Sequence, residues 1–265
     1  MNRLAALAAV LSVGVFFWVA HASRNRSRRL RLLQMAVLLV CSVPSLLFVV
    51  YYLHVLPERA WFYQLRSYAG SEFWILFLGA QMGMVAASLP RLLLGVPLVA
   101  LVLVAVVPYL KPILYPLPED AFHEKWRGNA CLQSTSATCG PAGVATILKA
   151  LGTSTTEHDV ARASYTYYGG TEAWYLARAV RRLGYDSYFE FQETFSPRAV
   201  LPALVGVRLG GTGHFIAVLS IKDGEVTYSD SLEGERHLPL AQFLRRYQFT
   251  GFHMCVMKRS MGSRT

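Results

Sequence analysis

Long apolar runs fill the first 110 residues of the chain, whereas shorter apolar runs alternate with polar residues in the rest. Four of the long runs, at about 4–20, 32–54, 73–89 and 92–110, approach the roughly 20 residues that a membrane-spanning helix needs. Tyrosine and tryptophan residues gather near the expected ends of these runs, as they do at membrane interfaces. The pattern predicts about four transmembrane helices over residues 1–110. The alternative is a set of buried core helices in a soluble protein.

A short proline-rich segment follows the last of these runs. Residues 111–120 contain three prolines, which favour an extended and fairly stiff chain, so we expect a linker there. Residues 121–265 are enough to form one hydrophobic core, and no internal repeat divides them. We therefore expect a single domain over that range. A GxxxxGK[ST] phosphate-binding loop does not occur in the sequence.

Within residues 121–265, helical periodicity comes first and strand-like patterns follow. Gly152 and Gly184 close two of the helices, and Thr156 with Asp159 resembles a capping box. The expected helices are Cys139–Leu151, about 157–164, and Glu172–Leu183 with Thr171 as its cap. The expected strands are Tyr185–Phe191, Ala203–Arg208, His214–Ile221, Val226–Ser229 and Gly251–Met257, with a further helix near Pro239–Tyr247. This order predicts an α+β domain in which helices precede an antiparallel sheet.

The net charge of +10 is unevenly distributed along the chain. Residues 1–110 hold nine Lys and Arg against two Asp and Glu, whereas residues 111–265 hold 17 against 14. Five of the arginines, at positions 24, 26, 28, 29 and 31, lie in one short loop between apolar runs. Such a cluster is typical of a cytoplasmic loop in a membrane protein and not of a nucleic-acid-binding face. Binding to lipid headgroups is a second interpretation of the cluster. We expect a lipid bilayer, and no nucleic acid, as a partner.

A cysteine that opens a helix holds the candidate chemistry. Cys139 is followed by Gly140 and Pro141 and then by a helical apolar pattern, so we expect it in the first turn of a helix. The positive end of the helix dipole there favours a thiolate. Gln133 lies six residues upstream, where its side-chain N–H and the backbone N–H of Cys139 can together hold an oxyanion.

A histidine and an aspartate complete the candidate site. His214 begins an expected strand after a glycine-rich loop, and Lys222–Glu225 is typical of a hairpin turn. Because a hairpin returns its second strand antiparallel to the first, we expect Asp230, at the end of that strand, near His214. A carboxylate there can orient the imidazole in a Cys–His–Asp arrangement. Asp223 is a weaker candidate, since it lies in the turn at the far end of the strand from His214.

A helix that carries the nucleophile, followed by a sheet that carries His and Asp, is the order of papain-like folds. Over roughly residues 129–258 the sequence resembles cysteine-peptidase family 39, the bacteriocin-processing peptidases that cut leader peptides after a double glycine. The resemblance rests on Gln133, Cys139-Gly-Pro-Ala142, His214-Phe215, and Asp230 after a hairpin. Thr138 stands where many members have Asp directly before the cysteine.

The resemblance implies a papain-like cysteine peptidase domain behind the membrane region. In it, Cys139 is the nucleophile, His214 the general base and acid, Asp230 its orienter, and Gln133 the oxyanion donor. The resemblance further implies a peptide or protein substrate and an export system as a candidate partner. Two other functions use the same residues: another acyl transfer, such as an amidase or transpeptidase reaction, and peptide binding without catalysis.

The other cysteines, histidines and arginines have structural interpretations. Cys131 and Cys139 are eight residues apart with no paired ligand motif nearby, so we expect neither a metal site nor a cofactor. If the domain is exported, Cys131 and Cys255 are candidates for a disulfide that leaves Cys139 free. Surface or structural roles are expected for His158, His237 and His253, and a solvated helix face for Arg178, Arg181 and Arg182.

Loop charges predict which side of the membrane the domain faces. If all four runs span, the arginine-rich loop and Arg91 share the cytoplasmic side, against fewer positive residues near the outer ends. This places the peptidase domain outside the cytoplasm, in an integral protein of a bacterial cell membrane. Ala20-His-Ala22 also resembles a signal-peptide cleavage site. A cleaved first run, or a short run that does not span, would instead leave the domain in the cytoplasm.

Overall fold

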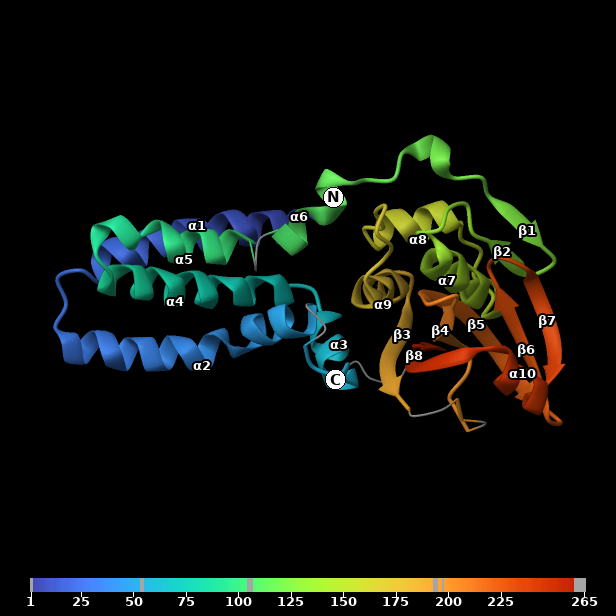
Figure 1. Ribbon diagram of the computed structural model, residues 1–265. Coiled ribbons are helices and arrows are strands. Elements are labelled where there is room, and N and C mark those ends of the chain that lie inside the picture. Colours follow the sequence, from blue (N-terminus) through green and yellow to red (C-terminus); the bar gives the residue numbers. More distant parts are fainter. Residues whose placement is uncertain (1, 53–54, 104–106, 193–194, 197, 260–265) are drawn as a thin grey trace. The chain divides into compact units, whose positions relative to one another are not determined.

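The structure is a computed structural model that describes residues 2–52, 55–103, 107–192, 195–196 and 198–259 (Figure 1). The contacts within the chain divide it into two compact units. The first unit is Met1–Glu58 with Ala69–Leu114, and the second is Arg59–Tyr68 with Tyr115–Thr265. We call them the helical unit and the sheet unit.

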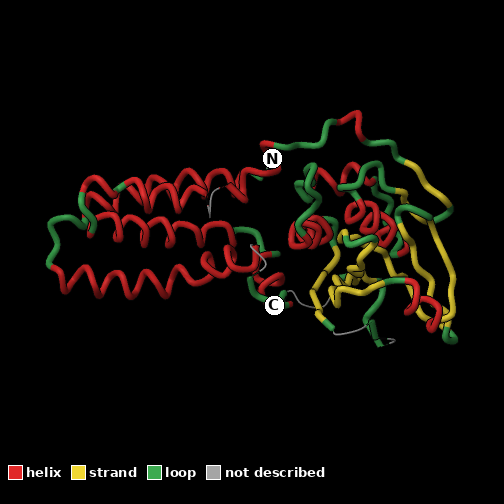
Figure 2. The backbone as a smooth tube through the Cα atoms, in the orientation of Figure 1, coloured by secondary structure: helices red, strands yellow, loops and turns green. Residues whose placement is uncertain are grey.

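The helical unit is built from helices joined by short turns (Figure 2). Helix α4 packs against both α1 and α2. Glycines on α4 allow α1 to come close, because a Cβ at Gly79 or Gly83 would collide with a backbone carbonyl of α1. The elements are α1 (Arg3–Ala22), α2 (Arg28–Tyr52), η1 (Ser71–Trp74), α4 (Ile75–Ser88), η2 (Arg91–Leu93), α5 (Gly95–Leu101) and α6 (Val107–Leu114).

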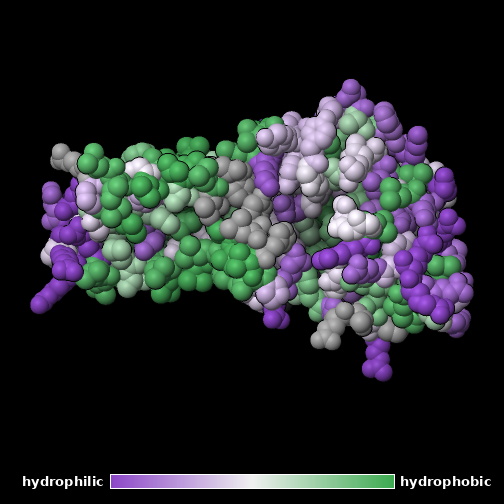
Figure 3. Space-filling model, in the orientation of Figure 1, coloured by the Kyte–Doolittle hydropathy of each residue, from purple (hydrophilic) through white to green (hydrophobic). Residues whose placement is uncertain are grey.

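Two helices in the described part of the chain, α1 and α2, are long and apolar enough to cross a membrane. The expected third and fourth runs form shorter helices: the third contains the 14-residue α4, and the fourth contains α5 and the start of α6. Helix α6 continues to Leu114, so the first residues of the expected 111–120 linker are helical and not extended. Residues 53–54 and 104–106, within the expected second and fourth runs, lie outside the described residues. Apolar side chains cover much of the visible surface of this unit, and the exposed arginines lie where α1 turns into α2 (Figure 3).

The sheet unit contains a six-stranded antiparallel sheet in the order β3-β8-β4-β5-β6-β7, and a separate ribbon of β1 and β2. The strands are β1 (Lys125–Arg127), β2 (Ala130–Leu132), β3 (Tyr185–Phe191), β4 (Ala203–Leu209), β5 (Thr212–Lys222), β6 (Glu225–Asp230), β7 (Gly234–Pro239) and β8 (Gln248–Lys258). The helical elements are α3 (Ala60–Arg66), η4 (Glu119–Ala121), α7 (Cys139–Ala150), α8 (Glu157–Ala163), α9 (Ala173–Arg182) and α10 (Leu240–Arg246). The expected α+β domain with an antiparallel sheet is confirmed.

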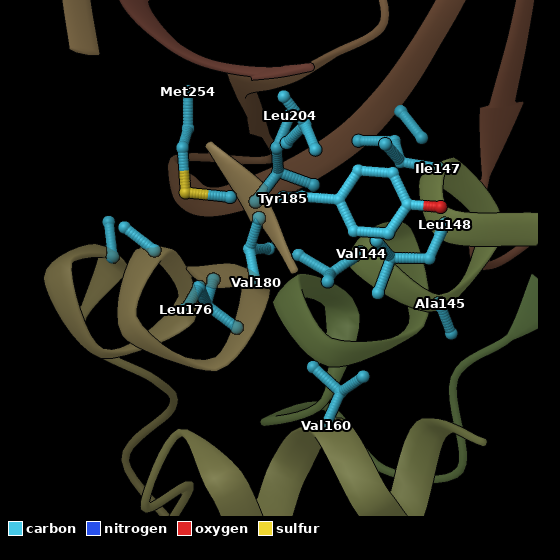
Figure 4. Packing of buried hydrophobic residues seen from close by; sticks show 14 of the residues in the cluster. Val144, Ala145, Ile147, Leu148, Val160, Leu176, Val180, Tyr185, Leu204 and Met254 are labelled. Carbon is cyan, nitrogen blue, oxygen red and sulfur yellow. The ribbon is translucent and has the colours of Figure 1, made fainter. Parts of the chain in front are cut away.

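Two clusters of buried side chains cover opposite faces of this sheet. On one face, Leu204 and Met254 pack with residues of α7, α8 and α9 (Figure 4). On the other face, Val205 and Cys255 pack with Phe243 of α10. Successive residues of a strand point to opposite faces, so the interior strands β4 and β8 are apolar on both sides. Residues 140–148 of α7 are all buried, and this packing fixes the helix that begins at Cys139.

A segment that lies between α2 and α4 in the sequence belongs to the sheet unit. Residues Arg59–Tyr68 contain α3, and Tyr63 of this helix packs against the main core cluster. The ring of Tyr63 lies with its centroid 5.3–5.8 Å from the rings of Trp174, Phe189, Phe191 and Phe252. We call residues 59–68 the docking segment.

Two arginines of α9 hold the end of α3, so the expected solvated face was wrong for them. Arg178 is 4% exposed and donates to the carbonyl oxygens of Arg66 and Tyr68 at 2.7 and 2.8 Å. Arg181 donates to the carbonyl of Ser67 at 3.0 Å. Cations at the carbonyl end of a helix stabilise it. The prediction failed because the residues that cover α9 lie 110 to 114 positions earlier, outside any local pattern.

The structure also contradicts the candidate disulfide between Cys131 and Cys255, because both are free thiols. Cys131 belongs to the cluster that packs with α7, whereas Cys255 belongs to the cluster on the opposite face of the sheet. The sheet therefore lies between the two sulfurs. Their positions near the two ends of the domain sequence gave no information about the face on which each side chain lies.

Several local predictions differ from the structure in detail. Strand β7 was not expected, because it is an edge strand whose exposed polar residues lack the apolar alternation of its neighbours. The N-cap of α9 is Glu172 rather than Thr171, whose hydroxyl instead lies 2.7 Å from that of Thr166. At the start of α8, Thr156 does accept from the Asp159 N–H, as the capping pattern predicted.

Candidate active site

Cys139 is the first residue of α7. Gly140 and Pro141 follow it in the first turn, where N–H groups have no partner within the helix. The side chain of Cys139 is half-buried, in contrast to the buried residues that follow it. The thiol therefore lies at the accessible, electropositive end of a helix that the core holds in place.

The hairpin of β5 and β6 brings a histidine and an aspartate together. Ile216 is opposite Asp230 in the antiparallel register, so Asp230 returns to within two positions of His214. His214 Nε2 lies 2.9 Å from Asp230 Oδ1, and both residues are buried. Because Nε2 faces the carboxylate, Nδ1 is the ring nitrogen left to face Cys139.

The environment of His214 favours its protonated form. Burial by itself lowers the pKa of the imidazole, but hydrogen bonds to Asp230 and to the Cys139 sulfur outweigh burial and raise the pKa from 6.5 to about 9. The ring is therefore an imidazolium at neutral pH. A cation of this kind beside a sulfur is the partner that a reactive thiolate requires.

Asp230 is held as a carboxylate by three donors. Oδ1 accepts from the Leu232 N–H at 3.0 Å as well as from the imidazole, and Oδ2 accepts from the Tyr247 hydroxyl at 2.8 Å. Burial alone would raise the pKa of this carboxyl, but the bonds from His214, Leu232 and Tyr247 outweigh it and hold the pKa below its usual range. Asp230 is thus a fixed negative charge next to the imidazolium.

Gln133 forms two hydrogen bonds with Ser231, the residue that follows Asp230. Its backbone N–H donates to the carbonyl of Ser231 at 2.9 Å, and its side-chain Oε1 accepts from the Ser231 hydroxyl at 2.7 Å. The amide nitrogen Nε2 donates one N–H to the carbonyl of Thr135 at 2.9 Å. An amide nitrogen carries two N–H groups, and the hydrogen bonds of the described residues use only one of them.

The loop from Gln133 to Cys139 is tied down by buried side chains. Thr138 is fully buried, and its hydroxyl donates to the Thr135 carbonyl and accepts from the Thr135 N–H, both at 3.0 Å. The carboxylate of Glu157, also fully buried, accepts from the N–H of Ser134 at 2.8 Å and from its hydroxyl. These bonds close a compact loop between the two residues expected to act on the substrate carbonyl.

The structure separates the weaker candidates from this cluster. Asp223 lies in the turn between β5 and β6, at the opposite end of the hairpin from His214. His158 lies 2.5 Å from Glu119, and His237 lies 3.1 Å from the hydroxyl of Thr227. His253 is buried in β8, where its ring stacks on Phe195. None of these side chains contacts Cys139 among the hydrogen bonds and ion pairs of the described residues.

Sequence reasoning missed three residues that support the site: Ser231, Tyr247 and Glu157. A serine directly after the candidate aspartate is a weak local signal for Ser231. Tyr247 and Glu157 act on groups 17 and 23 positions away, so no local pattern points to either of them.

The comparison with protein families decides the identity of this arrangement. The sequence model of the peptidase C39 family matches residues 120–261, which is more than half of the chain. The chain belongs to the peptidase C39 family. The sheet unit therefore contains a C39 domain. The family predicted from Gln133, Cys139, His214 and Asp230 is confirmed.

Parts of the chain are similar to other proteins. An uncharacterized protein of Methanothermobacter marburgensis is 33% identical over 102 residues, which are 38% of this chain and 70% of that protein. The peptidase domain of Streptococcus ComA, a bi-functional ABC transporter involved in a quorum sensing pathway, has a TM-score of 0.41 at 18% identity and covers 48% of this chain and 96% of that one. A double glycine motif protease from an AMS/PCAT transporter, in complex with the leader peptide, has a TM-score of 0.42 at 18% identity, covering 52% and 93%.

Proposed function

We propose that this chain is a cysteine peptidase in which Cys139 attacks the substrate, His214 transfers protons, Asp230 orients the imidazole and Gln133 stabilises the oxyanion. One observation carries the proposal. The half-buried sulfur of Cys139, at the start of a buried helix, lies close enough to the His214 imidazole to raise its pKa, and that imidazole is bonded to a buried carboxylate at 2.9 Å. Membership of the peptidase C39 family supports the same assignment.

In this mechanism the Cys139 thiolate adds to the carbonyl carbon of the scissile peptide bond, and the carbonyl electrons move to oxygen. The backbone N–H of Cys139 and an N–H of Gln133 stabilise that oxyanion. When the intermediate collapses, the C–N bond breaks and the imidazolium gives its proton to the leaving amine. Neutral His214 then takes a proton from water, the hydroxide adds to the thioester, and the acid product leaves as the thiolate forms again.

The proposed substrate class is a peptide with two glycines directly before the cleaved bond. The family resemblance seen in the sequence supports this class, because those peptidases cut leader peptides after a double glycine. Two consecutive glycines carry no side chains, so their backbone can come close to the half-buried thiol of Cys139. The amine product would be the mature peptide, and the acyl group held on Cys139 would be the leader.

The test uses the purified full chain in detergent micelles and a pool of synthetic peptides, some with an internal Gly-Gly. We expect mass spectrometry to find new termini after Gly-Gly with the wild type and none with Cys139→Ala or His214→Ala. Equal cleavage by wild type and Cys139→Ala would overturn the assignment. Transfer of the acyl group to an added amine in place of water would indicate a transpeptidase. Binding without any acylation of Cys139 would indicate a peptide-binding domain.

We further propose that the helical unit spans a membrane four times and that the C39 domain lies outside the cytoplasm. Helices α1 and α2 support two crossings. The four residues of η1 run directly into the 14 of α4, which together extend about 27 Å, close to the thickness of a bilayer core. The apolar run at 92–110, close to the roughly 20 residues that a crossing needs, supports the fourth crossing.

The docking segment supports the same topology. It packs with the C39 domain, and packed side chains cannot be separated by a bilayer, so residues 59–68 and 115–265 share one side. The chain between them then crosses an even number of times, as α4 and the α5–α6 stretch provide. The arginine-rich turn between α1 and α2 lies on the opposite side, which the distribution of positive charge makes the cytoplasm.

Reporter fusions after Thr265 test this orientation. Alkaline phosphatase, which is active only after export, should be active, and a cytoplasmic fluorescent reporter at the same site should be dark. A second pair of fusions after Arg26 should give the opposite result. An inactive phosphatase together with a bright fluorescent reporter after Thr265 would contradict the outward orientation.

A further inference from the structure

The hydroxyl of Ser231 makes a defined contact with the side chain of Gln133. Ser231 is 3% exposed, and its Oγ lies 2.7 Å from Gln133 Oε1. The identity of the amide atoms follows from their partners. A backbone carbonyl can only accept, so the atom 2.9 Å from the Thr135 carbonyl is the nitrogen of Gln133. The other amide atom is therefore oxygen, and Ser231 must be the donor to it.

These two contacts fix the rotation of the amide group. The torsion that ends a glutamine side chain is soft and roughly two-fold, so an unrestrained amide turns easily. Here the oxygen end is held by Ser231 and the nitrogen end by the carbonyl of Thr135. The backbone is fixed as well, because the Gln133 N–H donates to the carbonyl of Ser231 at 2.9 Å. Buried Glu157 holds the next residue, Ser134, through its N–H and its hydroxyl.

Ser231 also connects the two halves of the site. It directly follows Asp230, which binds His214, and it binds Gln133 from the loop that leads to Cys139. One short stretch at the end of β6 therefore contacts both the proton-transfer partner and the oxyanion donor.

We propose that Ser231 is a positioning residue that holds the side chain of Gln133 with its second N–H directed at the oxyanion. This inference rests on the proposed peptidase function and adds a residue to it. Ser231 itself does not touch the substrate. The N–H that Ser231 positions stabilises the negative charge that develops on the substrate carbonyl oxygen. Ser231 therefore lowers the energy of the transition state and does not strengthen substrate binding.

The first experiment replaces the hydroxyl alone. Ser231→Ala removes the donor to Oε1 but keeps the backbone carbonyl that binds the Gln133 N–H. With the best-cleaved peptide of the pool, we expect kcat to fall about three- to tenfold, the range for one neutral hydrogen bond, while KM stays unchanged. Ser231→Thr, which restores a hydroxyl, should recover most of kcat. Ser229→Ala is the matched control, since Ser229 is equally buried on β6 and makes no recorded bond to Gln133.

Two readouts separate positioning from a general loss of structure. Alkylation of Cys139 by iodoacetamide forms no oxyanion, so its rate should be the same in Ser231→Ala and in the wild type. The pH profile of kcat/KM, which reports on His214, should also stay in place. A slower alkylation or a shifted profile would show that Ser231 acts through Cys139, His214 or Asp230, and would overturn the proposal.

A double-mutant cycle with Gln133 gives the decisive result. Gln133→Ala should lower kcat on the order of 100-fold. In that background Ser231→Ala should cost nothing further, because no amide remains to be positioned. Losses that multiply in the double variant would overturn the positioning role while leaving the peptidase function intact. A wild type without Cys139-dependent cleavage would instead overturn the proposed function itself.

Discussion

At the scale of single residues, the buried carboxylate of Asp230 favours the charged form of the neighbouring His214 imidazole. Burial alone would make His214 a weaker base than free imidazole, yet its bonds to Asp230 and Cys139 raise its pKa to about 9. His214 therefore stays protonated from neutral pH up to about that value. The alkaline limit of that range is set by the loss of the proton from His214.

The first prediction concerns that alkaline limit. Asp230→Asn removes the negative charge that favours the imidazolium, so the pKa of His214 should fall and the alkaline limb of kcat/KM should move to lower pH. The maximum of kcat/KM should also fall, by about 10-fold or more, because the imidazole loses its orienting partner. A pH series of kcat/KM on wild type and variant measures both effects. Asp223→Asn, in the turn of the same hairpin, is the control and should leave the profile unchanged.

The second prediction distinguishes the thiols of the sheet unit. Burial raises the pKa of Cys131 to about 12 and that of Cys255 to about 11, and both side chains are fully buried. Iodoacetamide at pH 7.5 should therefore modify Cys139 and leave the other two until the protein unfolds. His214→Ala should slow the modification of Cys139 by about 10-fold or more, since the thiolate loses its cation.

Peptide mapping by mass spectrometry after timed labelling measures these rates. His237→Ala provides the control, because His237 lies on β7 and its recorded contacts are with Thr227 and Glu235. Modification of Cys131 at the rate of Cys139 would contradict the assignment of Cys139 as the activated thiol.

At the scale of secondary-structure elements, the docking segment adds a short helix, α3, to the core of the sheet unit. A helix of seven residues is too short to be stable by itself in water, so α3 depends on its packing. Tyr63 supplies ring contacts to the main core cluster, and Arg178 and Arg181 bind the carbonyl groups at its end. Phe252, one of the rings around Tyr63, also contacts Phe215, the neighbour of His214. The packing of α3 is therefore continuous with the core beneath the candidate site.

The third prediction follows from this packing. Tyr63→Ala should lower the free energy of unfolding of the sheet unit by about 2–4 kcal/mol, somewhat less than for a fully buried ring because Tyr63 is half-buried. The full chain is unfolded in detergent by heat or urea, and limited proteolysis within residues 115–259 monitors how much of the sheet unit has unfolded at each step. Gln64→Ala is the control on the same helix, since the recorded partner of Gln64 is the exposed Tyr68. Equal effects of the two substitutions would contradict a specific role for Tyr63.

At the scale of the whole molecule, the compact unit that holds the C39 domain includes residues from outside the family match. The family match begins at residue 120, whereas the compact sheet unit also includes residues 59–68. The chain thus completes the core of its C39 domain with a segment taken from between two apolar helices. In this arrangement the chain passes between the helical unit and the sheet unit at three places in the sequence, after residues 58, 68 and 114.

The fourth prediction tests this at the scale of the molecule. A fragment of residues 115–265 lacks the docking segment and should expose the aromatic rings that Tyr63 contacts, so it should be less stable than the full chain and prone to aggregate. Fusing residues 59–68 to its N-terminus through a flexible Gly/Ser linker should restore a soluble, cooperatively unfolding domain. The same fusion carrying Tyr63→Ala should not. Circular dichroism and size-exclusion chromatography compare the three proteins, and a fragment that is stable without the segment would contradict the prediction.

Local patterns in the sequence determined much of the fold and the candidate site. The helix at Cys139, the hairpin after His214, the closing glycines and the end of β6 at Asp230 follow from residues close to one another in the chain. The periodicity of apolar residues and the preferences of turns act over short distances, so these elements could be predicted. The ordered set of Gln133, Cys139, His214 and Asp230 was sufficient to indicate the family.

Only the tertiary structure decided which distant groups support those residues. The bonds from Ser231 to Gln133, from Tyr247 to Asp230 and from Glu157 to Ser134 join positions 17 to 98 residues apart. The docking of residues 59–68 onto α9 joins still more distant ones, and the side of the sheet on which each cysteine lies depends on strand pairing. These contacts depend on how whole elements pack and on which polar groups each buried donor finds. A local pattern carries no signal for either, because it describes one element at a time.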